Sequence, residues 1–251
     1  NDFINKGQSH ILQYNYQDRL IINMGYSYHY NSIGGAIINN TIASNSYSIR
    51  FNFESAGNIM YALSKATNIR KNSDGEYAIL GIPYAQYVKG EFDFSKNIRI
   101  DRRNSFAFHI GMGIAVPYGN AKTIPFEKQY FSGGANSVRG WTVRDLGPGS
   151  FVGNKNTNLL DQSGDIKLDA SIEYRSKLFW KFQGAIFVDA GNIWTIRDYD
   201  NQPGGVFKFD KFYKQIAVAY GLGLRLDLDF FILRFDGGMK ALNPVYEKGK
   251  D

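Results

Sequence analysis

The feature that most constrains this fold is an alternation of apolar and polar residues that continues over runs of ten residues and more. The run 165–175 shows it most clearly, with the apolar residues Ile166, Leu168, Ala170, Ile172 and Tyr174 separated by charged or polar ones. Successive side chains of a β-strand point to opposite faces of the sheet, so a period of two indicates a strand with one apolar face. The pattern predicts an all-β fold.

Similar runs recur along the 251 residues and predict about eight strands. The first run, 11–31, indicates either one long strand or a hairpin that turns near Asp18. The other runs are 46–55, 84–95, 106–118, 181–191, 215–230 and 231–240. The phase of the alternation changes at Phe231, which predicts a tight turn there.

The length of these runs favours a transmembrane barrel over a soluble sandwich. Strands of soluble proteins have about 5–6 residues, whereas membrane-spanning strands need about 9–11. Short connections near Lys177 and Asp229 alternate with long ones at 56–83, 117–164 and 192–214. Outer-membrane barrels alternate short periplasmic turns with long extracellular loops. We therefore predict an antiparallel outer-membrane β-barrel, with residues 1–251 forming part of one barrel domain.

Composition excludes several other classes of protein. The chain has no cysteine, which rules out a disulfide scaffold and any cysteine-based metal or nucleophile site. Its three histidines lack metal-ligand spacing, and no Ser/His/Asp set or phosphate-binding glycine motif is present. The net charge of +6 is spread along the chain without a dense basic run. We expect no catalytic residue, metal, cofactor or nucleic-acid partner.

The stretch 131–141, FSGGANSVRGW, interrupts the alternation and lies in the long connection 117–164. Its glycines permit positive φ and a close approach of the backbone to a neighbour. Its tip carries a single cation, Arg139, between Val138 and Gly140, with Trp141 following. We predict that this loop folds into the barrel lumen and brings Arg139 to a buried acidic partner.

Two carboxylates are candidate partners, because Glu173 and Asp189 lie on the polar faces of consecutive predicted strands. A turn centred at 179–181 would place them diagonally across the strand pair. Two carboxylates at such a short distance repel each other, and a guanidinium between them would remove the repulsion. The residues alone leave open the alternative that Arg139 faces solvent at the loop tip.

Three linked motifs resemble the barrel domain of the BamA/TamA family. The first is the loop sequence FEKQYFSGGANSVRGW with LGPGS at 146–150. The second is the strand GDIKLDASIEYR at 164–175, which carries Glu173. The third, FVDAGNIW at 187–194, is similar to the Phe-x-Asp-x-Gly strand of the family, with Phe187 and Gly191 in the motif positions. The resemblance begins at about Leu20. The amino-acid sequence of the loop is most similar to that of the TamA-like branch.

The resemblance implies a non-enzymatic factor that helps to fold and insert β-barrel clients into the outer membrane of a Gram-negative bacterium. Its implied partners are outer-membrane lipid and lipopolysaccharide, unfolded client proteins, and periplasmic or lipoprotein accessory subunits. It also implies a larger barrel, with the POTRA domains and the final strand outside this chain. Within the loop, it favours a buried Arg139 paired with Asp189 and Glu173.

Three alternatives remain. One is a translocation pore of the two-partner-secretion type. A second is a small closed barrel of about eight strands, a size that occurs in outer membranes. A third is a barrel enzyme that acts on lipid, for which we find no Ser/His or Asp/His set at one rim.

Overall fold

A computed structural model describes residues 18–32, 45–152, 162–200, 202–228 and 230–245. Its main element is an antiparallel sheet of eight strands. These are β1 (Asn23–Asn31), β2 (Asn45–Ala56), β5 (Tyr87–Arg99), β6 (Asn104–Pro117), β7 (Ile166–Lys177), β8 (Phe182–Trp194), β9 (Ala217–Asp227) and β10 (Ile232–Leu242). Most contain eleven residues or more, as the long alternating runs predicted.

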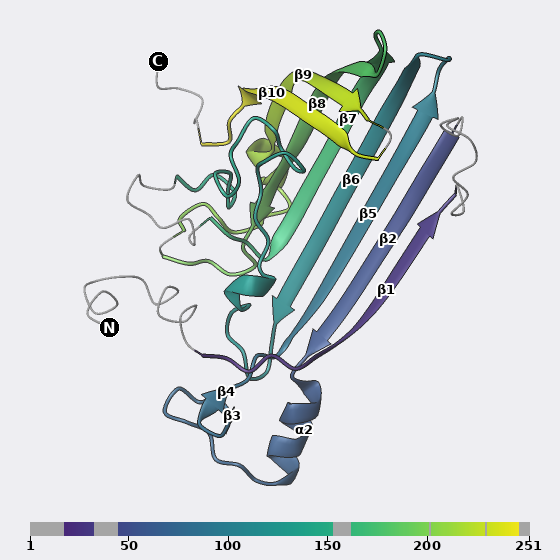
Figure 1. The fold of residues 1–251 in the computed structure, drawn as a ribbon. Helices are drawn as coiled ribbons and strands as arrows, with labels where there is room; N and C mark the ends of the chain where they lie inside the picture. Colours follow the sequence, from purple (N-terminus) through teal and green to yellow (C-terminus); the bar gives the residue numbers. More distant parts are fainter. Residues whose placement is uncertain (1–17, 33–44, 153–161, 201, 229, 246–251) are drawn as a thin grey trace.

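The strands pair in chain order, from β1 at one edge to β10 at the other. The sheet is curved, and the described parts of the long β6–β7 and β8–β9 connections lie on its concave side (Figure 1). This confirms the predicted all-β partial barrel. Within the described part of the chain, β1 and β10 do not pair with each other, so these strands do not form the small closed barrel considered as an alternative.

The alternation sorts side chains as predicted. On β6, Ile110, Met112 and Ile114 are exposed on the convex face, whereas Gly111 and Gly113 are buried on the concave face. Most residues on the convex face of the sheet are apolar, and most ionisable residues of the strands point inward. The concave face is therefore the polar interior of the partial barrel.

The short turns fall where the sequence predicted them. Residues 178–181 join β7 to β8, and the Leu178 N–H donates to the Phe182 carbonyl across this turn. The β9–β10 turn is held by a bond from the Leu228 N–H to the Phe231 carbonyl. Asp229 itself lies outside the described residues, as do the first seventeen residues of the chain, which include most of the predicted run before β1.

The connection 56–83, predicted as one of the long connections between strands, contains regular elements. It contains the helix α2 (Asn58–Ala66) and a small hairpin of β3 (Ala78–Ile79) and β4 (Ile82–Pro83). Short 3₁₀ turns occur at η1 (Phe126–Lys128) and η3 (Phe212–Gln215). In the described part of the chain, no helix has the length and apolar character needed to cross a membrane.

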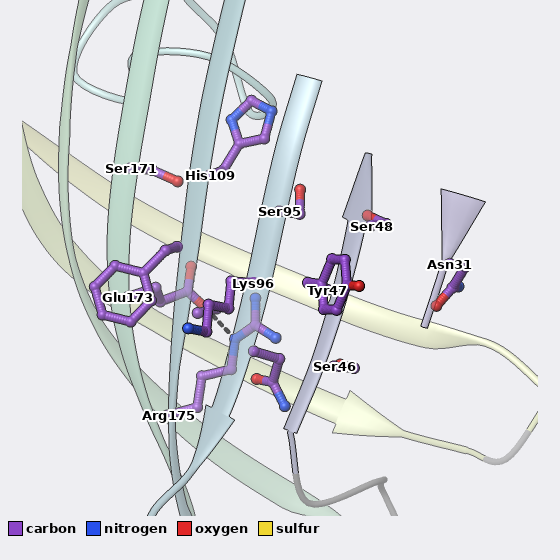
Figure 2. Close-up of a pocket in the computed structure, with 13 residues that line it drawn as sticks. Asn31, Ser46, Tyr47, Ser48, Ser95, Lys96, His109, Ser171, Glu173 and Arg175 are labelled. Carbon is purple, nitrogen blue, oxygen red and sulfur yellow. Dashed lines mark hydrogen bonds and ion pairs between the residues drawn. The ribbon is translucent and has the colours of Figure 1, made fainter. Parts of the chain in front are cut away.

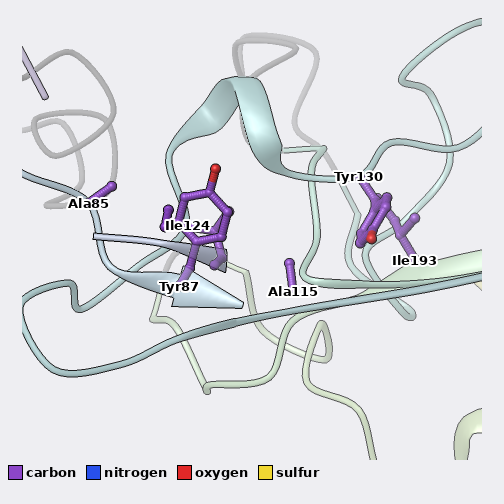
Figure 3. Close-up of a cluster of buried hydrophobic side chains, with 7 residues drawn as sticks. Ala85, Tyr87, Ala115, Ile124, Tyr130 and Ile193 are labelled. Carbon is purple, nitrogen blue, oxygen red and sulfur yellow. The ribbon is translucent and has the colours of Figure 1, made fainter. Parts of the chain in front are cut away.

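One apolar cluster fastens the β6–β7 loop to the ends of the strands. It is formed by Ala56, Ala85, Tyr87, Ala115, Ile124, Tyr130 and Ile193 (Figure 3). Tyr130 comes from the loop and lies over Gly113 of β6. A Cβ at position 113 would lie 2.6 Å from the Tyr130 ring, so this strand position needs glycine for the loop to pack against it.

Candidate functional site

The tip of the β6–β7 loop is buried inside the curve of the sheet. Val138 and Trp141 pack against Leu146 and against Ala217 and Ala219 of β9, forming a second apolar cluster. Burial of apolar surface drives this packing, and the small side chains of β9 leave room for the indole ring. The two apolar residues flanking the Arg-Gly pair therefore hold the tip against the barrel wall.

Arg139 makes three hydrogen bonds to Asp189. Its Nε and Nη2 atoms donate to Asp189 Oδ2 and Oδ1, each at 2.8 Å, and its backbone N–H donates to Oδ2 at 3.1 Å. The Arg139 side chain is 6% exposed and that of Asp189 is 0% exposed. This is the two-pronged geometry that a planar guanidinium offers a carboxylate and that an ammonium group cannot reproduce.

Glu173 is the second acceptor. Arg139 Nη1 donates to Glu173 Oε2 at 2.8 Å. In the β7–β8 register, Ser171 pairs with Asp189, which places Glu173 diagonally opposite Asp189 on the same face. The structure thus brings together Arg139, Glu173 and Asp189, and places the guanidinium between two carboxylates that would otherwise repel each other.

Phe187 and Gly191 complete the predicted strand motif on β8, and the structure separates their roles. The Arg139 guanidinium lies over the Phe187 ring, 3.4 Å from its centre. This stacking is favourable for a cation above an aromatic face. Gly191 does not contact the guanidinium. A Cβ at Gly191 would lie 2.6 Å from the Leu168 carbonyl oxygen, so this glycine permits close packing of β8 on β7.

A third carboxylate contacts Arg139, and the sequence reasoning missed it. Asp236 of β10 accepts from Arg139 Nη1 at 3.3 Å and pairs with Arg234 Nε at 3.0 Å. Asp236 is separated from Arg139 by 97 residues, and its inward position depends on the register of β10. Alternation on β10 was the available signal, since it placed Asp236 on the polar face.

Two further cations contact Glu173, namely Arg175, at 2.7 Å, and Arg225. We call the whole group the Arg139 cluster, and its members are Arg139, Glu173, Arg175, Asp189, Arg225, Arg234 and Asp236. It joins the loop to strands β7, β8, β9 and β10. Removing one member of such a buried network leaves its partners without compensation, which costs far more than breaking an exposed ion pair.

Gly140 and Gly238 allow the loop backbone to approach the wall at this point. A Cβ at Gly238 of β10 would lie 2.4 Å from the Arg139 carbonyl oxygen. A Cβ at Gly140 would lie 2.8 Å from the Ala219 Cβ. Neither glycine has positive φ, so the reason for glycine at both positions is space.

A polar hollow of about 280 Å³ lies beside the cluster on the concave face. Its lining includes His109, Ser171, Glu173 and Arg175, which Figure 2 shows on neighbouring strands with Arg175 beside Glu173. The Arg175 side chain is partly exposed to this hollow, whereas that of Arg139 is almost wholly buried. The cluster therefore borders this polar hollow towards β6 and a second hollow of about 590 Å³, lined by Arg139, Arg234 and Asp236, towards β10.

A separate carboxyl anchors the end of the loop. Asp165, just before β7, accepts a hydrogen bond from the Ile196 N–H at 3.0 Å. Burial raises the pKa of the Asp165 carboxyl to about 6, against the opposing effect of this bond. Asp165 thus ties the start of β7 to the β8–β9 connection.

In chemical terms, the site is a buried ionic network that fixes a loop to a barrel wall. In the part of the chain that the structure describes, no group of three or more histidine, aspartate and glutamate side chains is arranged to hold a metal ion. Every polar contact of Arg139 joins the loop to a strand. The fold and this network define a partial β-barrel with a loop held inside it.

The comparisons with known proteins agree with that class. Residues 16–249 match the Omp85 superfamily domain, and the chain belongs to this superfamily. The chain is 34% identical over 101 residues to the outer membrane protein assembly factor BamA of Neisseria meningitidis serogroup B. This aligned region covers 36% of this chain and 12% of that protein.

The fold is also similar to the crystal structure of BamA from Haemophilus ducreyi lacking POTRA domains 1–3. The TM-score is 0.49 at 16% identity, over 87% of this chain and 51% of that one. The chain thus spans about half of the solved relative and a much smaller part of the curated one.

Proposed function

We propose that this chain is part of the membrane-spanning barrel of an outer-membrane protein assembly factor of the BamA/TamA type. Such a factor helps β-barrel clients to fold and insert into the outer membrane of a Gram-negative bacterium. The observation that carries the proposal is the Arg139 cluster, which holds the loop tip inside the barrel within a chain of the Omp85 superfamily.

The physical basis of the proposed activity is strand pairing. An unpaired strand edge offers N–H and C=O groups that can template an incoming strand. In a barrel that works in this way, most strands have to remain rigidly paired while two neighbouring strands separate elsewhere. The Arg139 cluster supports this role because it links the loop to four consecutive strands through buried charges.

The proposed partners follow from this activity. They are unfolded outer-membrane clients, periplasmic or lipoprotein accessory subunits, and the lipid and lipopolysaccharide around the barrel. Within the superfamily, we assign the chain to the TamA-like branch. The support for this assignment is the amino-acid sequence of the loop, which reads PFEKQYF followed by SGGANSVRGW and LGPGS.

Depletion of the native protein in its own cells tests the proposed function. We expect folded outer-membrane barrels to fall, measured as the heat-modifiable fraction on gels, and unfolded precursors to accumulate. Re-expression of the native gene should restore assembly, whereas the Arg139→Ala variant at matched abundance should not. Normal assembly of all barrels after depletion would contradict the proposal.

The translocation-pore alternative predicts a different result. A pore needs an open lumen, but here the loop tip and its apolar cluster occupy the concave side. We expect low conductance of the purified full-length protein in planar bilayers, with an increase in the Arg139→Ala variant as the loop is released. A large, steady conductance of the native protein, with client assembly intact after depletion, would favour the pore.

A further inference from the structure

Helix α2 presents its apolar side away from the protein. Ile59, Ala62, Leu63 and Ala66 recur at the spacing of a single helix face, and all four are exposed. Ile59 is 54% exposed and Leu63 is 52% exposed. An ordinary surface helix of a soluble domain buries such a stripe against the core, so this one requires a partner outside the described chain.

The opposite side of α2 is the one that faces the barrel. Ser64 is its buried residue, and the Tyr84 hydroxyl donates to Ser64 Oγ at 3.3 Å. Asn58 Oδ1 accepts from the Tyr118 hydroxyl at 2.8 Å and from Gln86 Nε2 at 3.0 Å. These polar contacts fix the rotation of the helix, so its apolar stripe is held outward.

This stripe continues the apolar convex face of the sheet. Ile59 and Met60 share an apolar hollow with Ile22 and Met24, at the start of β1. Met24 is exposed on the convex face, as is Phe53 of β2. Figure 1 shows α2 just beyond the ends of β1 and β2. The apolar surface therefore passes from the strands to the helix through this hollow, whose lining is mostly apolar and also includes Ser55 and Asn58, joined to each other by a hydrogen bond at 2.7 Å.

The helix and the residues after it are positively charged. The segment 65–71 contains Lys65, Arg70 and Lys71 and no carboxylate. Lys65 Nζ lies 5.0 Å from the Tyr61 ring centre, and Lys71 Nζ lies 5.1 Å from that of Tyr77. The rings hold both ammonium groups beside the helix. An apolar stripe bordered by lysine and arginine is the pattern of a helix that binds at a lipid interface.

We propose that α2 is a lipid-binding element that inserts its Ile59–Leu63 stripe at the boundary of acyl chains and headgroups, while Lys65 and Lys71 contact lipid phosphates. The proposal rests on the membrane placement of the barrel under the proposed function and adds a specific lipid-contact site to it. The occupant is the lipid of the surrounding leaflet, because the stripe is continuous with the convex apolar face and its border is cationic.

Spin-label accessibility tests this proposal. These 251 residues contain no cysteine, and any cysteine elsewhere in the full-length protein would be replaced by serine before labelling. The full-length protein would be labelled at Leu63→Cys and placed in mixed phosphatidylethanolamine–phosphatidylglycerol vesicles. Collision rates with oxygen and with a water-soluble nickel chelate give the depth of the label. We expect the Leu63 label at a depth of about 5–10 Å within the interface.

Two further labels serve as controls. Asp74→Cys lies in the exposed connection after α2 and should be accessible to water. Leu224→Cys lies on the convex face of β9 and should be accessible to lipid. If the Leu63 label were as accessible to the chelate as the Asp74 label while the Leu224 label lay in lipid, the lipid-binding role of α2 would be overturned and the membrane placement of the barrel would stand. A Leu224 label in water would overturn the membrane placement and the inference with it.

The phosphate contact has its own test. Lys65→Gln combined with Lys71→Gln should make the Leu63 label shallower in the mixed vesicles, which are anionic, and change its depth less in phosphatidylcholine vesicles, where choline balances the phosphate charge within each headgroup. An unchanged depth in the mixed vesicles would overturn phosphate recognition. A Leu63 label that is aqueous in vesicles but immobilised in native outer membranes would overturn the lipid as occupant in favour of a protein.

Discussion

Arg139 and Asp189 are joined by three hydrogen bonds, although 50 residues separate them in the chain. Two of the bonds come from the guanidinium and one comes from the backbone N–H. The pair therefore fixes both the side chain and the main chain of the loop tip.

The close approach of the loop to β10 predicts different effects for two adjacent glycines. Gly238→Ala would place a Cβ 2.4 Å from the Arg139 carbonyl oxygen, whereas Gly237→Ala meets only the Leu222 carbonyl oxygen at 4.0 Å. Forcing an atom into packed space costs about 1–3 kcal/mol. We expect Gly238→Ala to lower thermal stability in detergent and Gly237→Ala to leave it nearly unchanged. Equal effects of the two would argue against the close approach.

The buried carboxyl of Asp165 predicts a dependence of stability on pH. Its pKa in the folded state, about 6, is above the ordinary value of 3.8, so the fold favours the protonated form. The stability contribution is present below the ordinary pKa and is lost as the pH rises through about 6. A shift of this size corresponds to about 3 kcal/mol.

Thermal unfolding of the wild type and of Asp165→Asn, at about pH 4 and about pH 7.5, measures this effect. We expect the variant to gain stability relative to the wild type at the higher pH. Asp101→Asn is a control of opposite sign, because hydrogen bonds from Asn104 lower the pKa of the Asp101 carboxyl. The same stability difference for Asp165→Asn at both pH values would rule out the raised pKa.

The convex face of β9 predicts sensitivity to charge. Leu224 is exposed on this face, and placing arginine on a lipid-facing strand costs about 2–4 kcal/mol near the bilayer midplane. Leu80, in the β3–β4 hairpin, is 98% exposed and lies outside the main sheet. We expect Leu224→Arg to lower the free energy of unfolding in vesicles and Leu80→Arg to change it little. Comparable values for the two would remove the case for lipid contact at Leu224.

The lengths of the connections predict the sidedness of the barrel. Asp200, in the long β8–β9 connection, should be extracellular, and Lys177, at the end of β7, should be periplasmic. Cysteine at position 200 should react with an impermeant thiol reagent on intact cells, whereas cysteine at position 177 should react only after lysis. Equal labelling of both positions on intact cells would contradict this topology.

The strands could be predicted because their signal is local. Alternation along β6 and β7 identifies the inward face from each segment alone, and so placed Glu173 on the polar side. The diagonal relation of Glu173 and Asp189 also followed, because the turn between β7 and β8 is short and fixes their register. Sequence motifs were needed to favour a buried Arg139 over an exposed one.

The parts that were missed depend on contacts distant in sequence or on a different period. Asp236 contacts Arg139 only because β10 pairs with β9 and the curvature of the sheet brings β10 next to the loop. Helix α2 lies in a stretch without alternation, yet Ile59, Ala62, Leu63 and Ala66 follow the helical spacing. A search for that period would have found the helix, although its outward orientation depends on the Tyr84–Ser64 contact.

Arg139 and Asp189 act together to hold the loop. Arg139→Ala should cost about 3–5 kcal/mol, because it leaves buried carboxylates without their shared cation. Arg139→Lys should recover part of this loss, since an ammonium group retains the charge but cannot make the two-pronged contact. Assembly of clients in cells should decline in the same order, with strand content by circular dichroism unchanged.

The most direct measurement is a double-mutant cycle on Arg139→Ala and Asp189→Ala, evaluated from unfolding free energies and from client assembly. The control cycle combines Arg139→Ala with Asp101→Ala, whose carboxyl lies in the β5–β6 turn and shares no partner with Arg139. We predict a coupling energy of about 1–3 kcal/mol for the Arg139–Asp189 pair and additivity within about 0.5 kcal/mol for the control. Additive effects of Arg139→Ala and Asp189→Ala would contradict the account.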